Sequence, residues 1–296
     1  MHNAARPLDL FAVCMTIGLC FAWGFNQVAA KVALAGIPPF TQGAIRSLIA
    51  AGIVAGWMRL RGIPLFKRDG TLRAGLAAGV LFGLEFLLIY PGLMWTTATR
   101  AVLFIYLAPF FVVLGARFFL PADRFVGAQW AGLVLSFAGM VVAFGLPTPA
   151  ADPRQALGDV LMVLAAAAWA ATTLVIKASV LNRAPFEKTM LYQLVVSAPM
   201  LGLAALLFGE RVTAVPGPIV LAAMAYQTLF VVPVTFVAWF ALIQRYSASR
   251  LSAFTFLTPI FGVLAGHLLL DEPLTMAFAA AVALVAAGLI MVNRVR

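Results

Sequence analysis

The chain has 296 residues, of which 64% are hydrophobic and 10% charged, with 20 Lys and Arg against 10 Asp and Glu. A soluble domain carries about 25% charged residues, so a protein this apolar could not cover its surface with polar groups in water. The lipid bilayer is therefore the expected solvent. The net charge of +10 then indicates basic cytoplasmic loops rather than nucleic-acid binding.

Apolar runs recur along the whole chain, most of them close to the roughly 20 residues that a membrane-spanning helix needs. Proline-containing segments separate most of the runs, as expected for a residue without a backbone N–H. The boundary near 93–97 is the least distinct. The runs predict an all-α membrane protein with ten transmembrane helices, near residues 8–30, 39–60, 72–93, 97–119, 125–146, 157–180, 188–208, 218–243, 249–270 and 274–292.

Ten spans place both termini on the same side of the membrane. With the termini in the cytoplasm, 15 Lys and Arg fall at the cytoplasmic side and 5 fall outside or inside the membrane. The cluster at 59–73 contributes most to this difference. Basic loops are translocated reluctantly, so the sequence predicts cytoplasmic N- and C-termini.

The second half of the chain repeats the first. FAWGFNQVAAKVALAGIPPF at 21–40 aligns with AAWAATTLVIKASVLNRAPF at 167–186, and FIYLAPFFVVLG at 104–115 aligns with FTFLTPIFGVLA at 254–265. The offset is 146 residues in the first pair and 150 in the second, which requires only small loop insertions. The two units are predicted to cover residues 8–146 and 157–292.

Each unit holds five predicted spans, and an odd number makes the second unit enter the membrane from the opposite side. Inverted repeats are typical of secondary transporters, in which each half can adopt the conformation of the other around a site near the midplane. Two alternatives stay open: a duplication retained only for folding, and a channel, although charged or carbonyl-rich filter loops are not evident.

Four short motifs stand out: Trp23 with Lys31 in the first span, APF at 108–110, TPI at 258–260 and the acidic DEP at 271–273. Together they resemble the EamA-type members of the drug/metabolite transporter superfamily. The resemblance covers the whole chain and is strongest to exporters of aromatic amino acids. It implies a central cavity between the repeats and efflux of small metabolites. The family often has an acidic residue after span four as well as after span nine, but here the first repeat reads LPADR at 120–124, so Asp123 takes a slightly shifted place. Asp123 and Glu272 are therefore interpreted as structural loop residues.

Glu85 is the most informative single residue, because a carboxylate inside a predicted span is expensive unless it faces a cavity or a partner. It is predicted to contact a substrate amine or to couple transport to protons. The alternative is a structural ion pair, for which Arg46 and Arg100 are the possible partners. Its equivalent in the second repeat is Thr235, so its role is not duplicated.

Polar and aromatic residues inside the spans are further candidates to line a cavity, since amides and hydroxyls bind a zwitterion and rings bind flat organic solutes. Packing between helices is the competing interpretation. Besides Glu85, the substrate-cavity candidates are Trp23, Asn26, Gln27, Tyr90, Trp169, Thr172, Tyr192, Gln227 and Trp239.

Pro109 and Pro259 occupy equivalent places in spans four and nine, where each is predicted to kink its helix and to permit gating. Close helix packing is predicted at the glycines that recur every fourth residue. These glycines are Gly75, Gly79 and Gly83, the pair Gly52 and Gly56, and the pair Gly262 and Gly266.

These features predict a multi-pass protein of the bacterial inner membrane that exports small organic metabolites. The resemblance implies aromatic or hydrophobic amino acids as the solutes. No cofactor, metal, nucleic-acid partner or ATPase subunit is expected, since the chain has no GxxxxGK[ST] phosphate loop. The lipid bilayer and a small-molecule substrate are the expected partners of a monomer or weak homo-oligomer. Alternatives are antiport or import of nucleotide sugars or other metabolites, which needs a cationic cavity, and a lipid-modifying membrane enzyme.

Overall fold

The computed structural model describes residues 8–65, 67–146, 149–150, 152–270 and 274–294. Within these residues the fold is all helical, and ten helical stretches are long and apolar enough to cross a membrane. No predicted end of a span lies more than four residues from the observed one. The spans are α1 (Leu10–Ala33), α2 (Pro39–Leu60), α3 (Leu72–Trp95), α4 with α5 (Ala98–Ile105, Ala108–Phe119), α6 (Gly127–Phe144), α7 (Pro153–Ala178), α8 (Phe186–Leu207), α9 with η3 and α10 (Pro218–Ala225, Tyr226–Phe236, Val237–Arg245), α11 with α12 (Ala248–Phe254, Leu257–Leu270) and α13 (Met276–Arg294).

Local sequence explains where several helices begin. The Asp9 carboxylate accepts a hydrogen bond from the Ala12 N–H at 2.8 Å, and the Asp152 carboxylate accepts one from the Gln155 N–H at 2.9 Å. Each side chain thereby caps a helix N-terminus. Pro39 begins α2, in the first turn, where the backbone N–H groups have no partner within the helix and a missing N–H costs little. The long apolar segments that follow form helices, in which backbone N–H and C=O groups hydrogen-bond to each other within the segment, as the lipid requires.

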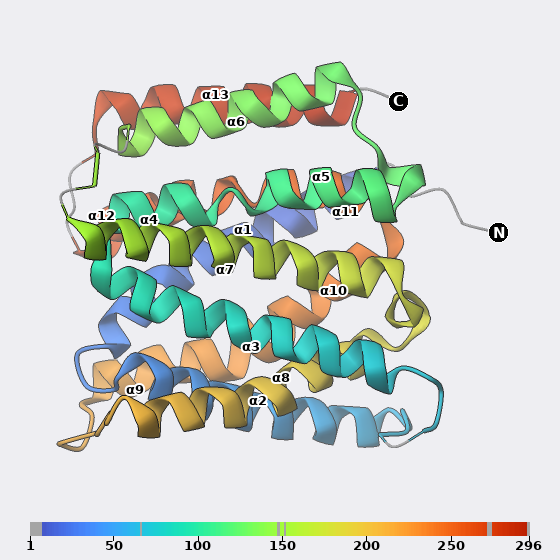
Figure 1. The fold of residues 1–296 in the computed structure, drawn as a ribbon, viewed down its shortest axis with the longest axis vertical. Coiled ribbons are helices and arrows are strands. Elements are labelled where there is room, and N and C mark those ends of the chain that lie inside the picture. Colours follow the sequence, from blue (N-terminus) through green and yellow to red (C-terminus); the bar gives the residue numbers. More distant parts are fainter. Residues whose placement is uncertain (1–7, 66, 147–148, 151, 271–273, 295–296) are drawn as a thin grey trace.

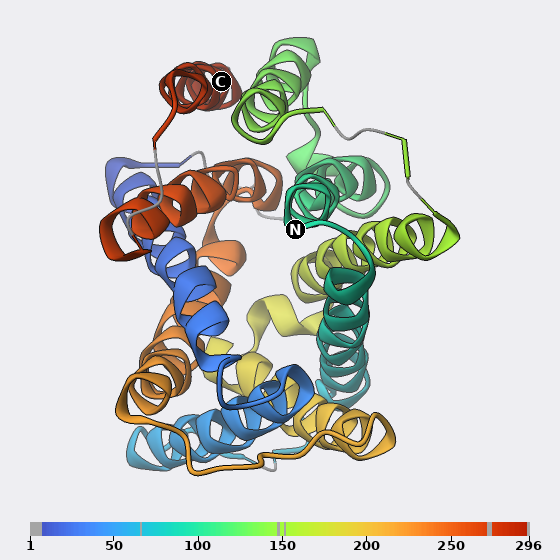
Figure 2. The same ribbon diagram turned by 90° about the vertical axis from the view of Figure 1, so that its left-hand side faces the viewer.

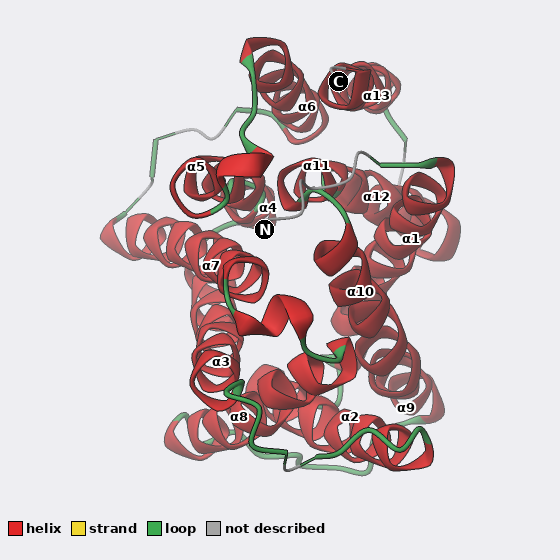
Figure 3. Cartoon of the chain, turned by 90° about the vertical axis from the view of Figure 1, so that its right-hand side faces the viewer, coloured by secondary structure: helices red, strands yellow, loops and turns green. Residues whose placement is uncertain are grey.

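Eight spans surround the middle of the molecule, and α6 and α13 pack against each other outside that ring (Figures 1 and 3). One side of the ring is formed by α3 and α7 and a second side by α1 with the span α9–α10 (Figure 3). The pair α2 and α8 forms the third side of the ring. The spans α4–α5 and α11–α12 form the fourth side.

Equivalent helices of the two halves run in opposite directions. At the start of α2, the Phe40 ring lies 5.0 Å from that of Phe208, just beyond the end of α8, in a tilted arrangement. The middle of α2 meets the middle of α8, where Ser197 donates to Ser47 at 3.2 Å. This antiparallel pairing is the geometry that two inverted five-helix units predict.

Three spans are interrupted. Span four breaks at Tyr106–Leu107 and span nine at Thr255–Phe256, and in both cases a proline follows within the first turn of the second helix. Pro109 and Pro259 therefore sit where the missing N–H costs little. Span eight contains a π-helical stretch around Pro233. π-helical turns are rare in proteins, and those that occur are often found at functional sites.

The glycine prediction holds for α3 and fails for α2. A Cβ at Gly75 or Gly79 would collide with Tyr192 or Val196 of α8, so α3 and α8 approach closely there. By contrast, no described atom lies within 4 Å of a Cβ built at Gly52 or Gly56. These two glycines face away from neighbouring helices, because α2 uses its other face to pack on α8 and η3.

Candidate functional site

A large vestibule, lined by charged as well as apolar residues, opens at one end of the bundle, the end formed by the loop residues 60–65, 67–72, 119–127, 178–186 and 245–248. We call this the basic end, and the other side of the bundle the opposite end. The vestibule has a volume of about 1520 Å³, and its lining includes six Lys or Arg and two Asp. Both described ends of the chain lie at the basic end (Figures 1 and 3).

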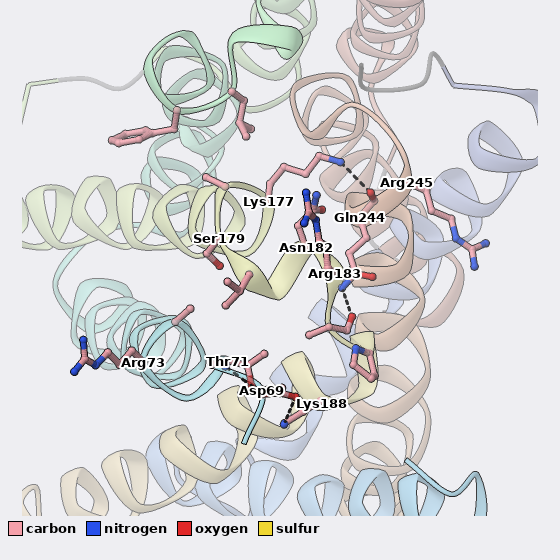
Figure 4. Close-up of a pocket in the computed structure, with 18 of the residues that line it drawn as sticks. Asp69, Thr71, Arg73, Lys177, Ser179, Asn182, Arg183, Lys188, Gln244 and Arg245 are labelled. Carbon is pink, nitrogen blue, oxygen red and sulfur yellow. Dashed lines mark hydrogen bonds and ion pairs between the residues drawn. The ribbon is translucent and has the colours of Figure 1, made fainter. Parts of the chain in front are cut away.

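Two of these cations are bound by other groups of the protein. Lys188 at the start of α8 forms an ion pair of 2.7 Å with Asp69 and donates to the Lys67 carbonyl (Figure 4). Lys177 at the end of α7 donates to the carbonyls of Ile243, Gln244 and Tyr246, at 2.5 to 3.1 Å. Helix C-terminal carbonyls favour a cation, so the two lysines fix the walls of the vestibule.

Asp69 and Asp123 join the two halves of the chain at this end. The hydrogen bond from Lys188 and that from Thr71 hold the pKa of Asp69 well below its usual range. Asp123 is buried between α5 and α6 and accepts hydrogen bonds from the Ser247 hydroxyl and the Ser249 N–H. Its burial raises the pKa of Asp123, opposed by these donors. The interpretation of Asp123 as a structural residue agrees with these contacts, whereas Glu272 lies outside the described residues.

Deeper in the membrane, side chains of three spans form an aromatic cluster, which comprises Trp23, Phe82, Thr235, Phe236 and Trp239. The Trp23 Nε1–H donates to the Thr235 hydroxyl at 2.8 Å. The Trp23 ring lies 5.2 Å from Trp239 in a T-shaped arrangement and 5.7 Å from Phe236. Phe82 packs edge-on against Phe236 at 5.9 Å. The structure thus brings together Trp23, Trp239 and the repeat equivalent of Glu85.

Glu85 lies on the face of α3 that also carries Ala78 and Phe82, both of which are buried. The structure gives its carboxylate no ion pair or hydrogen bond with the described residues, although the charge of Arg46 acts on it from α2. Arg46 is only 6% exposed, and its guanidinium lies 4.6 Å above the Phe86 ring. Its Nε and Nη2 atoms are buried without a hydrogen-bond partner among the described residues.

Three more predicted residues lie around this region. Gln227 is buried in η3 and donates to Gln42 at 3.5 Å. The Asn26 side chain of α1 has a buried Oδ1 that no described donor reaches. Tyr90 of α3 packs edge-on against Phe40 at 5.3 Å, on the side of α3 that faces α2 and α8.

The remaining candidates lie elsewhere in the bundle. Gln27 is exposed on α1, beside Gly262 of α12, and Trp169 of α7 packs edge-on against Tyr106 at 6.2 Å. The Thr172 hydroxyl donates to the Ala168 carbonyl of its own helix at 2.9 Å. That these residues, or Pro109 and Pro259 at the helix breaks, act in transport stays a prediction.

Tyr192 lies near the basic end of α8, away from the aromatic cluster. Its hydroxyl lies 3.0 Å from that of Thr71, and its ring packs against Gly75. Both contacts link α8 to the start of α3, so they explain Tyr192 as part of the packing between the halves.

At the opposite end, Arg100 of α4 forms a buried ion pair with Asp159 of α7, and Thr96 donates to the same carboxylate at 2.6 Å. Arg100 is therefore committed to Asp159 and is not the partner of Glu85. The sequence analysis overlooked Asp159, although an acidic residue inside a predicted span is a signal of the kind that singled out Glu85.

The ten spans and the antiparallel pairing of equivalent helices define a multi-pass membrane protein built from two inverted halves. The model of the EamA-like transporter family matches residues 10–145 and again residues 156–294. The chain therefore belongs to the EamA-like transporter family, within the drug/metabolite transporter superfamily.

Individual proteins resemble the chain over most of its length. The uncharacterized transporter YoaV of Bacillus subtilis is 24% identical, and the match covers 93% of this chain and 94% of YoaV. A probable amino-acid metabolite efflux pump of Salmonella typhimurium is 23% identical over 90% of this chain and 89% of its own length. A solved crystal structure shares the fold with a TM-score of 0.82 and 22% identity, and the match covers 96% of this chain and 98% of the other.

Proposed function

We propose that this protein exports amino acids and closely related metabolites, aromatic and hydrophobic ones included, across the bacterial inner membrane. The two halves alternate around a binding site near the bilayer midplane, and the termini and the basic end face the cytoplasm. The vestibule is then the entrance through which a cytoplasmic solute reaches the site.

The vestibule is the observation that carries this proposal. It is lined by six Lys or Arg and two Asp, holds about 1520 Å³ and lies at the end whose loops carry most of the Lys and Arg, the end that the distribution of basic residues predicts to be cytoplasmic. A wide entrance on that side suits the collection of a solute for export. The Salmonella typhimurium relative that is named an amino-acid metabolite efflux pump supports the same substrate class.

The charge of the vestibule also bears on the alternative of phosphorylated metabolites or nucleotide sugars. Those substrates need several cations directed at one point. Instead, Lys188 is paired with Asp69, and Lys177 is bonded to backbone carbonyls. Arg73 and Arg245 point away from the middle of the vestibule (Figure 4). Of the six lining cations, Lys67 and Arg183 remain, fewer than the other four, so the arrangement favours zwitterionic or weakly charged solutes.

The test is transport by the purified protein in liposomes. Vesicles are loaded with a panel of labelled amino acids, and with a sugar phosphate as a negative control, and efflux is followed with and without a pH gradient. We expect saturable efflux of at least one aromatic or aliphatic amino acid and none of the sugar phosphate. Efflux of the sugar phosphate alone, or of nothing in the panel, would contradict the proposal.

A further inference from the structure

Arg46 is a permanent positive charge buried inside the membrane-spanning part of the protein. It is the eighth residue of α2, so it lies about 10 Å along the helix from the opposite end at 1.5 Å per residue. An arginine stays protonated in proteins. Burial of an unpaired ion is expensive, yet two of its nitrogen atoms have no acceptor among the described residues.

The surroundings of Arg46 account for only part of that cost. The Phe86 ring, 4.6 Å from the guanidinium carbon, offers a cation–π contact. Glu85 lies next to Phe86 in the chain and is close enough for the Arg46 charge to act on it, but the two side chains are beyond ion-pair distance. The guanidinium and the carboxyl group thus lie on neighbouring helices, α2 and α3, without an ion pair between them.

A buried guanidinium and a carboxyl group placed in this way are complementary to a zwitterion, whose ammonium group would stabilise the ionised form of the carboxyl group. An α-amino acid carries a carboxylate and an ammonium group on one carbon atom. A guanidinium binds a carboxylate with two parallel hydrogen bonds, and a carboxylate accepts the three donors of an ammonium. A ligand that bridges Arg46 and Glu85 would satisfy both groups with its two charges.

The environment also provides for the side chain of such a ligand. On α3, Glu85 shares its face with Phe82 of the aromatic cluster, one helical turn away. Along α7, Gly158 lies against Trp95 at the end of α3 and against Thr96, which follows it, and Met162 lies against Gly92. This antiparallel register puts Glu85 and Trp169 at the same level of the bundle.

We propose that Arg46 and Glu85 form the binding site for the zwitterionic head of the transported amino acid: Arg46 binds its carboxylate and Glu85 its ammonium group. This inference rests on the proposed function, because it specifies how the exported solute is recognised. It also gives the asymmetry of the two halves a reason, since Thr235 replaces Glu85 in the second half.

The experiment compares three ligands that differ only in their charged groups. L-phenylalanine, phenethylamine and 3-phenylpropionate are tested as competitors of amino-acid efflux from liposomes, and L-leucine, isoamylamine and isocaproate form a parallel aliphatic set. The wild-type protein should prefer each amino acid over its amine and its acid by about tenfold or more, the effect of ~1.4 kcal/mol of differential binding.

Each variant should lose one of these preferences. Arg46→Gln should bind the amino acid no better than the amine, while Glu85→Gln should bind the amino acid no better than the acid. Arg46→Lys keeps the positive charge but lacks the planar guanidinium that binds a carboxylate with two hydrogen bonds. It should retain a reduced preference for the amino acid over the amine. The matched control is Ser47→Ala, next to Arg46 but directed at Ser197 of α8, which should keep both preferences.

The readout is a ratio within one protein preparation, so a loss of folded protein does not imitate the effect. If the wild-type protein transports no amino acid, the proposed function fails. If it does so and every folded variant of Arg46 and Glu85 keeps the wild-type preferences, the proposed function stands and the zwitterion site is wrong.

Discussion

Arg46 and Arg100 are both buried in membrane-spanning helices of the first half, yet only Arg100 has a carboxylate partner. Arg100 pairs with Asp159 across the interface between α4 and α7, and Thr96 satisfies a further position on that carboxylate. A buried pair of this kind contributes little net stability when intact, but the removal of one partner leaves an uncompensated charge. The two arginines should therefore respond differently to substitution.

Asp159→Asn and Arg100→Gln are each expected to lower the free energy of unfolding by about 3–5 kcal/mol, the cost of a buried charge without its partner. The double variant should lose clearly less than the sum, because neither charge remains. Thermal unfolding in detergent, arranged as a double-mutant cycle, measures this coupling. Additive losses would show that the pair does not interact in solution.

Asp69→Asn should remove a pH-dependent contribution to stability. The hydrogen bond from Lys188 holds the pKa of Asp69 well below its usual range, so the folded state binds the proton more weakly than the unfolded chain. The stabilisation is then fully present above the unfolded pKa of about 3.9 and is lost as the pH falls below it. At pH 7 we expect the variant to lose about 2 kcal/mol, the scale of a hydrogen bond to a charged group.

Unfolding temperatures between pH 3 and 8 check this expectation for Asp69. The difference between wild type and variant should stay constant from pH 5 to 8 and shrink below pH 4. Lys188→Gln should abolish the same part of the pH dependence, since it removes the other partner. A wild-type profile below pH 5 that matches that of Asp69→Asn would refute the role of the pair.

At the scale of helices, the sequence predicts the ten spans closely because apolar length and proline boundaries are local properties. The breaks in spans four and nine also have a local signal in Pro109 and Pro259. The π-helical stretch at Tyr226–Phe236 is not predictable in this way. Pro233 marks it, but Pro91 and Pro199 lie inside α3 and α8 without producing one.

Contacts between helices explain why only part of the candidate site could be predicted. Glu85 and Trp23 are conspicuous in the sequence because charge and repetition single them out. The pairing of Arg100 with Asp159, 59 residues away, depends on how α4 packs against α7. The missing partner of Arg46 is likewise a property of the packed structure, since nothing in the local sequence distinguishes it from Arg100.

The contact between α6 and α13 leads to a prediction about single helices. A Cβ at Gly132 would lie 2.6 Å from the Gly288 carbonyl oxygen, whereas no described atom lies within 4 Å of one at Gly18. Gly132→Ala should therefore destabilise the protein by about 1–3 kcal/mol through overpacking. Gly18→Ala should be neutral or stabilise it by up to about 1 kcal/mol, because alanine is the better helix former.

Unfolding in detergent at a single pH compares the two glycine variants. Both carry the same substitution within a long span, so a general effect of the added methyl group cancels. Equal stability of the two variants would mean that α6 and α13 are not in close backbone contact.

At the scale of the whole molecule, polar links between the halves lie at both ends of the bundle. Lys188–Asp69 and the contacts of Asp123 join the halves around the vestibule, and Arg100–Asp159 joins them at the opposite end (Figure 2 shows the helices at that end). Because the two halves are inverted, an exchange of their conformations turns a state open at one end of the bundle into a state open at the other end. Alternating access then requires that the links at one end weaken when that end opens.

Accessibility of the vestibule tests this mechanism. Asn182 lines the vestibule, so Asn182→Cys, in a background without Cys14 and Cys20, should react with a hydrophilic thiol reagent added from the basic end. Asp159→Asn weakens the link at the opposite end and should shift the population toward opening there, which slows the reaction at position 182. Lys188→Gln weakens a link at the basic end and should leave the reaction unchanged or accelerate it.

Arg61→Cys serves as the control, because residue 61 is exposed at the basic end and does not line the vestibule. Its reaction rate should be the same in all backgrounds, and the ratio of the two rates reports the opening of the vestibule alone. A shift of about tenfold corresponds to ~1.4 kcal/mol in the balance between the two states. If Asp159→Asn and Lys188→Gln change the ratio in the same direction, the two ends do not open in alternation, and a rigid pore would explain the protein better than a carrier.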